Sequence, residues 1–195
     1  MNIHTLSLGA YQTNTYILWQ EESGKCLVID PGYDADTILD TVSRLGLSVE
    51  AILLTHGHFD HVGAVKDLAA DTGCRVFLHP AETTLPPQIT AGSLYFTDSY
   101  DEGDRLNLAG MCVSVLSTPG HTPGSVCLLV ENNLFSGDTL FADSCGRTDF
   151  PGGSHAQMLS SLRRLAQLEA ELNVYPGHGF STHLTREKQT NPYLR

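Results

Sequence analysis

The densest group of side chains able to do chemistry is a run of three histidines and one aspartate: His56, His58, Asp60 and His61. Imidazole nitrogens and carboxylate oxygens are the usual protein ligands of zinc, iron and manganese. Buried without a metal ion, these four groups would all need hydrogen-bond partners in one place. The run directly follows residues 51–54, an apolar stretch with the character of a buried strand. The sequence therefore predicts a metal site at the end of a strand.

Three more candidate ligands, His121, Asp138 and His178, each lie in a loop marked by glycine or proline after a strand-like segment. His56 and His58 are two residues apart in an extended segment, so their side chains point to the same side and can chelate one ion. His121 would complete a three-histidine site for that ion.

A second ion can be accommodated beside the first. Asp60 and His61 are adjacent and lie where the chain turns into the next helix, and His178 is the remaining ligand on that side. Asp138 can bridge the two ions with one oxygen each. Two such ions can hold a hydroxide and deliver it to a carbonyl carbon near neutral pH. These residues predict a binuclear hydrolytic centre in which Asp60 and Asp138 are catalytic, with Asp60 also accepting a hydrogen bond from the hydroxide.

The N-terminal half alternates between strand and helix patterns, which is typical of an α/β protein. We expect one helix after Asp34 that stops at Gly46, and a second, after the histidine loop, through Val65, Leu68 and Ala69 to Gly73. Residues 80–103 are expected to form a short helix and a surface loop. Strands are expected at residues 3–8, 14–19, 25–30, 49–54 and 75–78.

The C-terminal half repeats this plan of antiparallel strands, ligand-bearing loops and a helix. Ser154 can cap a helix whose apolar positions are Leu159, Leu162, Leu165 and Leu168. Strands are expected at residues 105–108, 111–117, 125–130, 133–136 and 173–175, with a helical turn or two at 184–191. We predict a single domain over residues 1–195, a sandwich of two mixed β-sheets with outer helices and ligands at one edge.

Composition restricts the partners and the compartment. The formal net charge of −11 argues against nucleic acid, because phosphate binding needs a basic patch. The apolar runs are far shorter than a bilayer span, and the N-terminus lacks the pattern of a secretory signal, so we expect no membrane association. The five cysteines are odd in number and form no Cys-x-x-Cys pair, which indicates free thiols in a reducing cytoplasm.

The His-x-His-x-Asp-His motif at residues 56–61, with His121, Asp138 and His178 in order, resembles the metallo-β-lactamase superfamily over nearly the whole chain. The resemblance implies an αββα sandwich. Flavodiiron members of that family usually have glutamate where His58 stands, and true β-lactamases generally lack an aspartate like Asp138. The ligand set is therefore similar to that of the glyoxalase II group, the hydroxyacylglutathione hydrolases and their relatives.

A second motif, residues 137–141 followed by 144–150, is similar to the glyoxalase II-like and persulfide dioxygenase branch. A basic residue matching Arg147 helps to hold a glutathione carboxylate in glyoxalase II, although Arg147 could instead pair with Asp149. Phe141 and Phe150 are expected to bind substrate, and Phe59 could join them. We expect at least one of these three rings to pack in the core instead.

The resemblance extends to the end of the chain. Residues 191–194 resemble short members of the branch, and the chain ends about where full glyoxalase II enzymes begin a C-terminal helical domain with further glutathione contacts.

The expected function is hydrolysis of a small-molecule thioester, S-lactoylglutathione or a related acyl-glutathione, with two divalent metal ions. Zinc is the first choice, and iron or manganese would fit the same donors. The main alternative is a glutathione persulfide dioxygenase with one iron, which by resemblance would use His56, His121 and Asp138. A lactonase is the third candidate. A non-catalytic binding module would be expected to have lost ligands, and none of the seven is missing.

Overall fold

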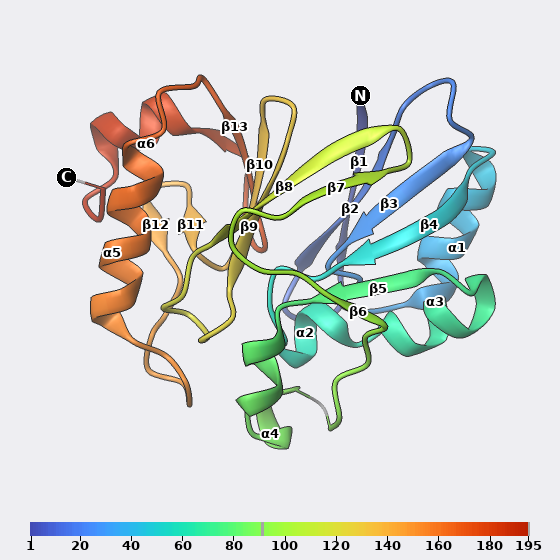
Figure 1. Ribbon diagram of the computed structural model, residues 1–195, viewed down its shortest axis with the longest axis horizontal. Coiled ribbons are helices and arrows are strands. Elements are labelled where there is room, and N and C mark those ends of the chain that lie inside the picture. The colour runs from blue at the N-terminus through green and yellow to red at the C-terminus, as the bar shows by residue number, and fades with distance from the viewer. Residues whose placement is uncertain (91, 195) are drawn as a thin grey trace.

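Two six-stranded sheets packed face to face form the centre of the computed structural model, which describes residues 1–90 and 92–194. Helices α1 and α3 cover the outer face of one sheet, and α5 and α6 cover the other (Figure 1). The layers therefore follow the order helix, sheet, sheet, helix. This architecture confirms the predicted αββα sandwich.

The first sheet has the strand order β1-β2-β3-β4-β5-β6, antiparallel from β1 to β3 and parallel from β3 to β6. Its strands are β1 (Asn2–Leu8), β2 (Thr13–Trp19), β3 (Lys25–Ile29), β4 (Ser48–Leu53), β5 (Arg75–Leu78) and β6 (Asp98–Ser99). The helical segments of this half are α1 (Ala35–Arg44), α2 (Phe59–Val62), α3 (Val65–Thr72), the 3₁₀ turn η1 (Pro80–Thr84) and α4 (Pro87–Thr90).

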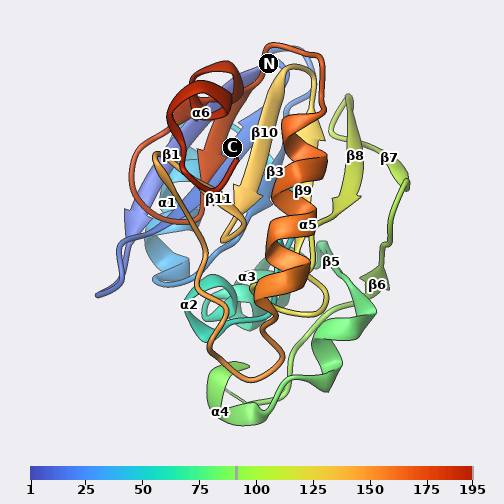
Figure 2. The ribbon, with the colours of Figure 1, turned by 90° about the vertical axis from the view of Figure 1, so that its left-hand side faces the viewer.

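The second sheet has the order β14-β13-β10-β9-β8-β7, in which β10 and β13 are parallel and the other pairs antiparallel. Helix α5 crosses its outer face (Figure 2). The elements are β7 (Arg105–Leu108), β8 (Met111–Ser117), β9 (Val126–Val130), β10 (Asn133–Gly137), the hairpin β11 (Leu140–Phe141) and β12 (Ser144–Cys145), α5 (His155–Ala166), β13 (Asn173–Pro176), β14 (Thr182–His183) and α6 (Leu184–Thr190).

The apolar pattern of each strand explains the layering. On β3, Leu27 and Ile29 face the second sheet, whereas Cys26 and Val28 face α1 and α3. Successive side chains of a strand point to opposite faces, so a continuous apolar run can fill two cores at once. On α5, Leu162 is among the buried residues that pack against the second sheet.

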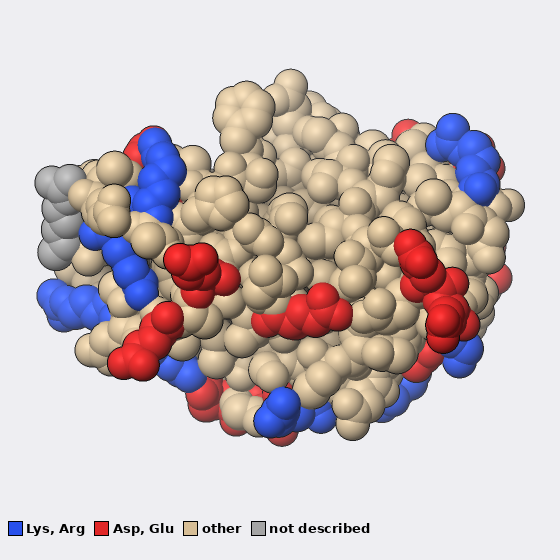
Figure 3. All heavy atoms as spheres, turned by 90° about the horizontal axis from the view of Figure 1, so that it is seen from above, with Lys and Arg blue, Asp and Glu red and all other residues tan. Residues whose placement is uncertain are grey.

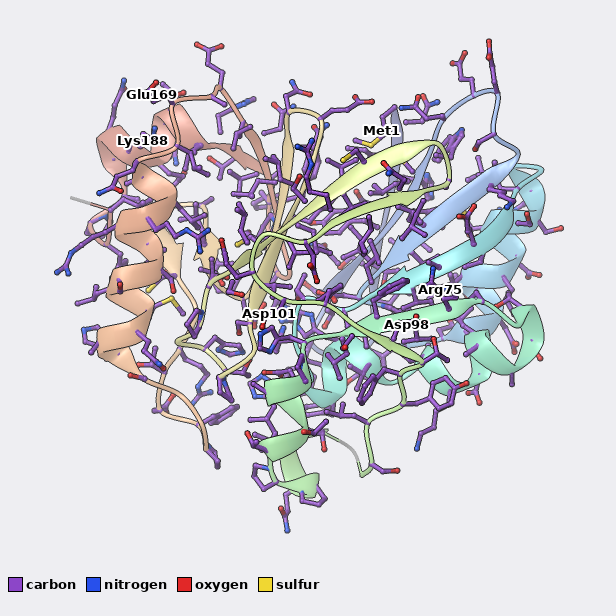
Figure 4. All side chains as sticks on the ribbon, viewed as in Figure 1. Met1, Arg75, Asp98, Asp101, Glu169 and Lys188 are labelled. Atoms are coloured by element: carbon purple, nitrogen blue, oxygen red, sulfur yellow. The ribbon has the colours of Figure 1, made fainter. Side chains whose placement is uncertain are left out.

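The structure departs from the predicted elements in several short segments. Residues 80–103 contain β6 as well as helical turns, and residue 91 within this range lies outside the described residues. Arg75 of β5 and Asp98 of β6 lie side by side (Figure 4), and their ion pair of 2.6 Å holds this two-residue strand at the sheet edge. Strands β11, β12 and β14 are equally short, so none carries a periodic pattern. Leu168 packs against the apolar core between the second sheet and α5, but it lies beyond the end of α5.

On the face shown in Figure 3, acidic and basic side chains are interspersed among uncharged residues. None of the helices within residues 1–90 and 92–194 is both long enough and apolar enough to cross a bilayer. All five cysteines are free.

Candidate metal centre

Four loops that follow β4, β8, β10 and β13 converge at one edge of the sandwich. The loop after β4 carries His56 and His58 and leads into α2, which carries Asp60 and His61. The loop between β8 and β9 carries His121. Asp138 directly follows β10, and His178 follows β13. A backbone hydrogen bond of 2.9 Å from Val126 N–H to the Thr55 carbonyl joins the loops of the two sheets. The structure brings all seven predicted ligand residues together.

The first group consists of His56, His58 and His121, whose candidate ligand atoms lie within 4.8 Å of one another. All three side chains are buried. The Nδ1 of His58 lies 2.8 Å from the Nε2 of His121, so two ring nitrogens face each other at close range. A shared cation would use both lone pairs.

The second group consists of Asp60, His61 and His178, which also lie within 4.8 Å of one another. The Nε2 of His61 is 3.3 Å from the Nε2 of His178, and the latter atom is 3.2 Å from Asp60 Oδ2. Two nitrogens and one carboxylate oxygen thus point at a common position.

Asp138 lies between the two groups. Its Oδ2 is 3.4 Å from His121 Nε2 and 3.7 Å from His178 Nε2, and its Oδ1 is 3.5 Å from His61 Nε2. One carboxylate therefore contacts ligands of both groups, as a bridging residue would.

Asp30 and Thr55 set the orientation of two histidines. The Thr55 hydroxyl donates to Asp30 Oδ2 at 2.6 Å, so it accepts from His56 Nδ1 at 3.1 Å. The same Asp30 oxygen accepts from His61 Nδ1 at 2.9 Å. A proton on Nδ1 leaves the Nε2 lone pair free, which is how partners of a metal-binding histidine fix its tautomer.

Backbone carbonyl groups orient two further histidines in the same way. His121 Nδ1 donates to the Arg147 carbonyl at 2.8 Å, and His178 Nδ1 donates to the Tyr11 carbonyl at 3.1 Å. Four of the five histidines thus present Nε2 to the centre, and His58 presents Nδ1.

Unpaired buried atoms test whether these donors fit a metal. Among the described residues, the buried side-chain atoms without a hydrogen-bond partner are His56 Nε2, His58 Nε2 and Asp138 Oδ1. Unpaired buried polar atoms are costly, and two of the three, His56 Nε2 and Asp138 Oδ1, belong to ligand groups that face the centre, whereas His58 faces it with Nδ1. The set of five imidazoles and two carboxylates therefore fits two divalent ions.

The pKa values of His56 and His58 favour neutral imidazoles. Burial lowers the pKa of His56 well below its ordinary value, and the neighbouring histidines, His61 first, lower it further. Burial, His121 and His61 lower the pKa of His58 to about 4. Neutral imidazole is the form that binds a metal, so His56 and His58 are ready to bind at neutral pH.

The two histidines of the second group, His61 and His178, are protonated more readily than His56 and His58. Burial opposes a charge on His61, but the carboxylates of Asp138, Asp30 and Asp60 outweigh it and raise the pKa of His61 to about 9. Burial is likewise outweighed at His178, whose pKa is raised by its hydrogen bond to Asp60. Burial would raise the pKa of Asp60, yet His178 and His61 hold it below its ordinary value. Asp60 is therefore an ionised hydrogen-bond acceptor at neutral pH.

Close backbone contacts explain the glycines around the ligands. A Cβ at Gly177 would lie 2.4 Å from Asp138 Oδ1 and 2.6 Å from His61 Cε1. A Cβ at Gly137 would lie 2.4 Å from Thr55 Oγ1, and Gly137 also has a φ of +48°. The expectation that these glycines let the side chains converge agrees with these contacts.

The sequence did not point to two acidic residues that hold the ligand loops. Asp30 could have been suspected from its place at the end of an apolar strand directly before Pro31-Gly32. In the structure it has a φ of +48°. Glu82 accepts hydrogen bonds from the backbone of two ligand loops. It follows an ordinary helical-turn signal, so no pattern in the sequence distinguishes it.

An open cavity of about 560 Å³ lies over the ligands. Phe59, Phe141 and Phe150 all line it, together with Tyr11 and Cys145. Among the described residues, the apolar cores between the layers include none of these three phenylalanines. The expectation that at least one of them would pack in the core is therefore wrong. The hairpin β11–β12 carries Phe141 to the cavity wall, which places it away from the core.

Arg147 has a partner within its own loop. Its guanidinium forms two hydrogen bonds of 2.7 Å with the Asp149 carboxylate and lies 3.9 Å from the centre of the Phe150 ring. This is the bracing pair that the sequence left as an alternative to substrate binding. The side chain also lines the cavity and remains 56% exposed, so it can reach a bound ligand.

Comparisons of the sequence give a consistent family. The family model described as the metallo-beta-lactamase superfamily matches residues 8–178. A hydroxyacylglutathione hydrolase, GloC, from Haemophilus influenzae is 34% identical over 209 residues, covering 100% of this chain and 98% of the relative. A hydroxyacylglutathione hydrolase from Methylobacillus flagellatus is 41% identical over 176 residues, covering 88% of this chain and 64% of the longer relative.

Solved structures share the whole architecture. The B3 metallo-beta-lactamase BLEG-1 has a TM-score of 0.92 at 34% identity, with 99% of both chains covered. TTHA1623 in a di-iron-bound form has a TM-score of 0.86 at 38% identity, covering 98% of this chain and 100% of that one. ETHE1 from Myxococcus xanthus has a TM-score of 0.86 at 31% identity, covering 98% and 84%.

Proposed function

The chain belongs to the metallo-β-lactamase superfamily, and we propose that it is a binuclear hydrolase that cleaves the thioester bond of S-lactoylglutathione or a related acyl-glutathione. The observation that carries this proposal is the position of Asp138, which contacts His121 of one ligand group and His61 and His178 of the other. Relatives named hydroxyacylglutathione hydrolase support the substrate class.

Each of the seven side chains would be a ligand of one or both metal ions. His56, His58 and His121 would hold one ion, Asp60, His61 and His178 the other, and Asp138 both. Two bound divalent ions supply a water molecule of lowered pKa and positive charge for the oxygen of the thioester carbonyl.

Asp60 and the aromatic wall have complementary roles. Because its pKa is held below the ordinary range, Asp60 stays an acceptor and can orient the attacking water through a hydrogen bond. Phe141 and Phe150 form apolar walls of the cavity and can position the acyl group. The leaving thiol has an ordinary pKa of about 8.5, so it can depart as a thiolate without a separate general acid.

The identity of the metal and the compartment belong to the same proposal. Imidazole-rich sites of this kind suit zinc, and the di-iron form of TTHA1623 supports iron as an alternative in the same fold. The five free thiols fit a reducing compartment, so we place the reaction in the cytoplasm.

Two substitutions test the hydrolase proposal. His56→Ala and Asp138→Ala should each abolish hydrolysis of S-lactoylglutathione while the circular dichroism spectrum stays that of the wild type. His183→Ala is the matched control, because this exposed histidine lies in β14 outside the ligand groups. Metal-replete wild-type protein without activity on S-lactoylglutathione or any other acyl-thiol would refute the proposal.

A glutathione persulfide dioxygenase with one iron is the second candidate. Its expected ligands, His56, His121 and Asp138, lie close together, and the similarity to ETHE1 fits this alternative. Metal analysis separates the two functions. About two ions per chain with thioesterase activity supports the hydrolase, whereas one iron with oxygen uptake on glutathione persulfide supports the dioxygenase.

A further inference from the structure

We propose that Glu82 is a positioning residue that sets the spacing of His56, His58 and His121 by holding together the two loops that carry them. Glu82 lies in η1, directly after β5, and its side chain is fully buried. It is not one of the seven candidate ligands. The inference rests on the proposed metal centre, and it concerns the geometry of one half of that centre.

The two carboxylate oxygens of Glu82 serve different loops. Its Oε2 accepts from the Gly57 N–H at 2.6 Å, and its Oε1 accepts from the Gly124 N–H at 2.7 Å. Gly57 stands between His56 and His58 in the loop after β4, whereas Gly124 belongs to the loop of His121 after β8. One side chain thus joins a loop of the first sheet to a loop of the second.

Both backbone partners are glycines, and both approach the carboxylate closely. A Cβ at Gly57 would lie 3.0 Å from Glu82 Oε2, and a Cβ at Gly124 would lie 2.8 Å from Oε1. Any other residue at these positions would push the carboxylate away. The local sequence of each loop therefore fits the presence of the buried carboxylate beside it.

The burial of Glu82 needs an explanation beyond loop packing. A buried carboxylate is costly to desolvate, and burial raises the pKa of Glu82. Hydrogen bonds from the Thr122 hydroxyl and from the N–H groups of Gly57 and Gly124 favour its ionised form. Charge-assisted hydrogen bonds from an anion to backbone N–H groups are shorter and stronger than neutral ones. A carboxylate can therefore fix two loops more firmly than a neutral side chain of the same size.

Rigid spacing matters because a metal site requires its ligands in a fixed geometry. Partners that orient metal ligands typically change metal affinity by about 10- to 100-fold when they are lost. Glu82→Gln keeps the shape but replaces one acceptor oxygen by an NH₂ group, which cannot accept from a backbone N–H. One of the two loops then loses its hydrogen bond, and the three-histidine group should bind zinc more weakly.

Zinc affinity measured by competition with a chromophoric chelator tests this expectation. The measurement uses full-length, chelator-treated protein in a His178→Ala background, which retains the three-histidine group and removes a ligand of the other. We expect Glu82→Gln to weaken zinc binding there by about 10- to 100-fold. The d–d absorption of bound cobalt(II) should also change, because it reports ligand geometry.

Two further variants keep the test decisive. Glu82→Asp retains both oxygens but is one methylene shorter, so it should also weaken binding. Glu187→Gln is the matched control, because Glu187 is fully buried and accepts hydrogen bonds from Asp143 and Asn191 away from Gly57 and Gly124. We expect this control to lower the melting temperature and to leave the zinc affinity of the three-histidine group unchanged.

Several results would overturn the proposal. Wild-type zinc affinity and cobalt spectrum in Glu82→Gln would do so, as would an equal loss of affinity in Glu187→Gln. If Glu82→Gln does not fold, Glu82→Asp decides, and failure of both to fold would show a general folding role instead. Zinc affinity is independent of the substrate, so a wild-type protein without thioesterase activity would refute the proposed function and leave this result intact.

Discussion

Four of the five histidines of the centre are oriented by the atom that their second ring nitrogen contacts. Thr55 and Asp30 hold Nδ1 of His56 and His61, so both rings present Nε2 to the centre. Such partners fix the tautomer as well as the direction of the ring. The geometry of the site therefore depends on Thr55 and Asp30, which are not among the seven candidate ligands.

The two ligand groups should bind zinc with different pH dependence. Burial lowers the pKa of His56 and lowers that of His58 to about 4, so these two ligands are neutral at pH 7 and should add little pH dependence to zinc binding above about pH 5. His61, with a pKa raised to about 9, must lose a proton when zinc binds. The apparent affinity of its group should therefore rise with pH, by up to about tenfold per pH unit, and level off near pH 9.

Competition titrations of chelator-treated protein at several pH values measure both affinities. Calorimetry in buffers of different ionisation enthalpy counts the protons released. Equal pH dependence of the two binding steps, or no proton release near neutral pH, would contradict this assignment.

Arg147 offers a prediction about the thiol carrier. Its guanidinium is paired with Asp149, and this exposed pair holds the pKa of Asp149 down to about 2. Asp149→Asn should free the guanidinium for a glutathione carboxylate and lower KM for S-lactoylglutathione by up to about fivefold, the range of an exposed ion pair. The kcat should stay unchanged, because the substitution leaves the Arg147 carbonyl that orients His121 in place and changes only the partner of the guanidinium.

A thioester of N-acetylcysteamine, which lacks carboxylates, is the control substrate. Its KM should be the same in the wild type and in Asp149→Asn. An unchanged KM for both substrates would show that Arg147 only braces its loop.

At the scale of elements, long apolar segments were predictable and short ones were not. The apolar run at residues 51–54 predicted β4, because a strand that is buried on both faces is apolar throughout. Two-residue strands such as β6 and β14 depend on pairing partners far away in the chain, which a local pattern does not contain. Their existence follows from the completed sheets.

The candidate site follows the same distinction. The histidine run was evident because its residue types and spacing are unusual in themselves. Asp30 and Glu82 were missed because their importance lies in contacts across 25 or more residues, with Thr55 and with Gly57 and Gly124. A sequence shows donors and acceptors, but it does not show which of them meet.

Gly177→Ala tests how closely the loop after β13 approaches the ligands. The added Cβ would lie 2.4 Å from Asp138 Oδ1, so the bridging carboxylate must move. We expect bound metal to fall below two ions per chain and kcat to fall by more than about tenfold, because small displacements of catalytic groups cost about 100-fold.

Gly24→Ala is the control for this change. Gly24 has a φ of +61° and no atom within 4 Å of an added Cβ. Its substitution should cost about 1 kcal/mol of stability through backbone strain and leave metal content unchanged. Equal metal content in Gly177→Ala and wild type would contradict the close contact.

At the scale of the whole molecule, the centre exists only where the two halves of the sandwich meet. His56 and His58 come from the first sheet and His121 from the second, and the second ligand group likewise combines Asp60 and His61 with His178. A shared core that includes Leu53 of β4 and Phe135 of β10 packs the two sheets against each other. The fold therefore acts as the scaffold that brings distant ligands to one edge.

The overall charge of the molecule affects how the metal centre can bind an anionic substrate. With a net charge of −11, the molecule repels an anionic substrate at long range. Bound cations would supply the positive charge that the cavity needs, since Arg147 is the one arginine or lysine among its described lining residues. Binding of an anionic thioester should therefore depend on metal content.

The most direct test is a zinc titration of chelator-treated protein while the hydrolysis of S-lactoylglutathione is followed. Activity should be absent without metal and should rise to a plateau at about two equivalents of zinc per chain, because both ligand groups are needed. A plateau at one equivalent, or no hydrolysis at any zinc loading, would contradict a binuclear thioesterase.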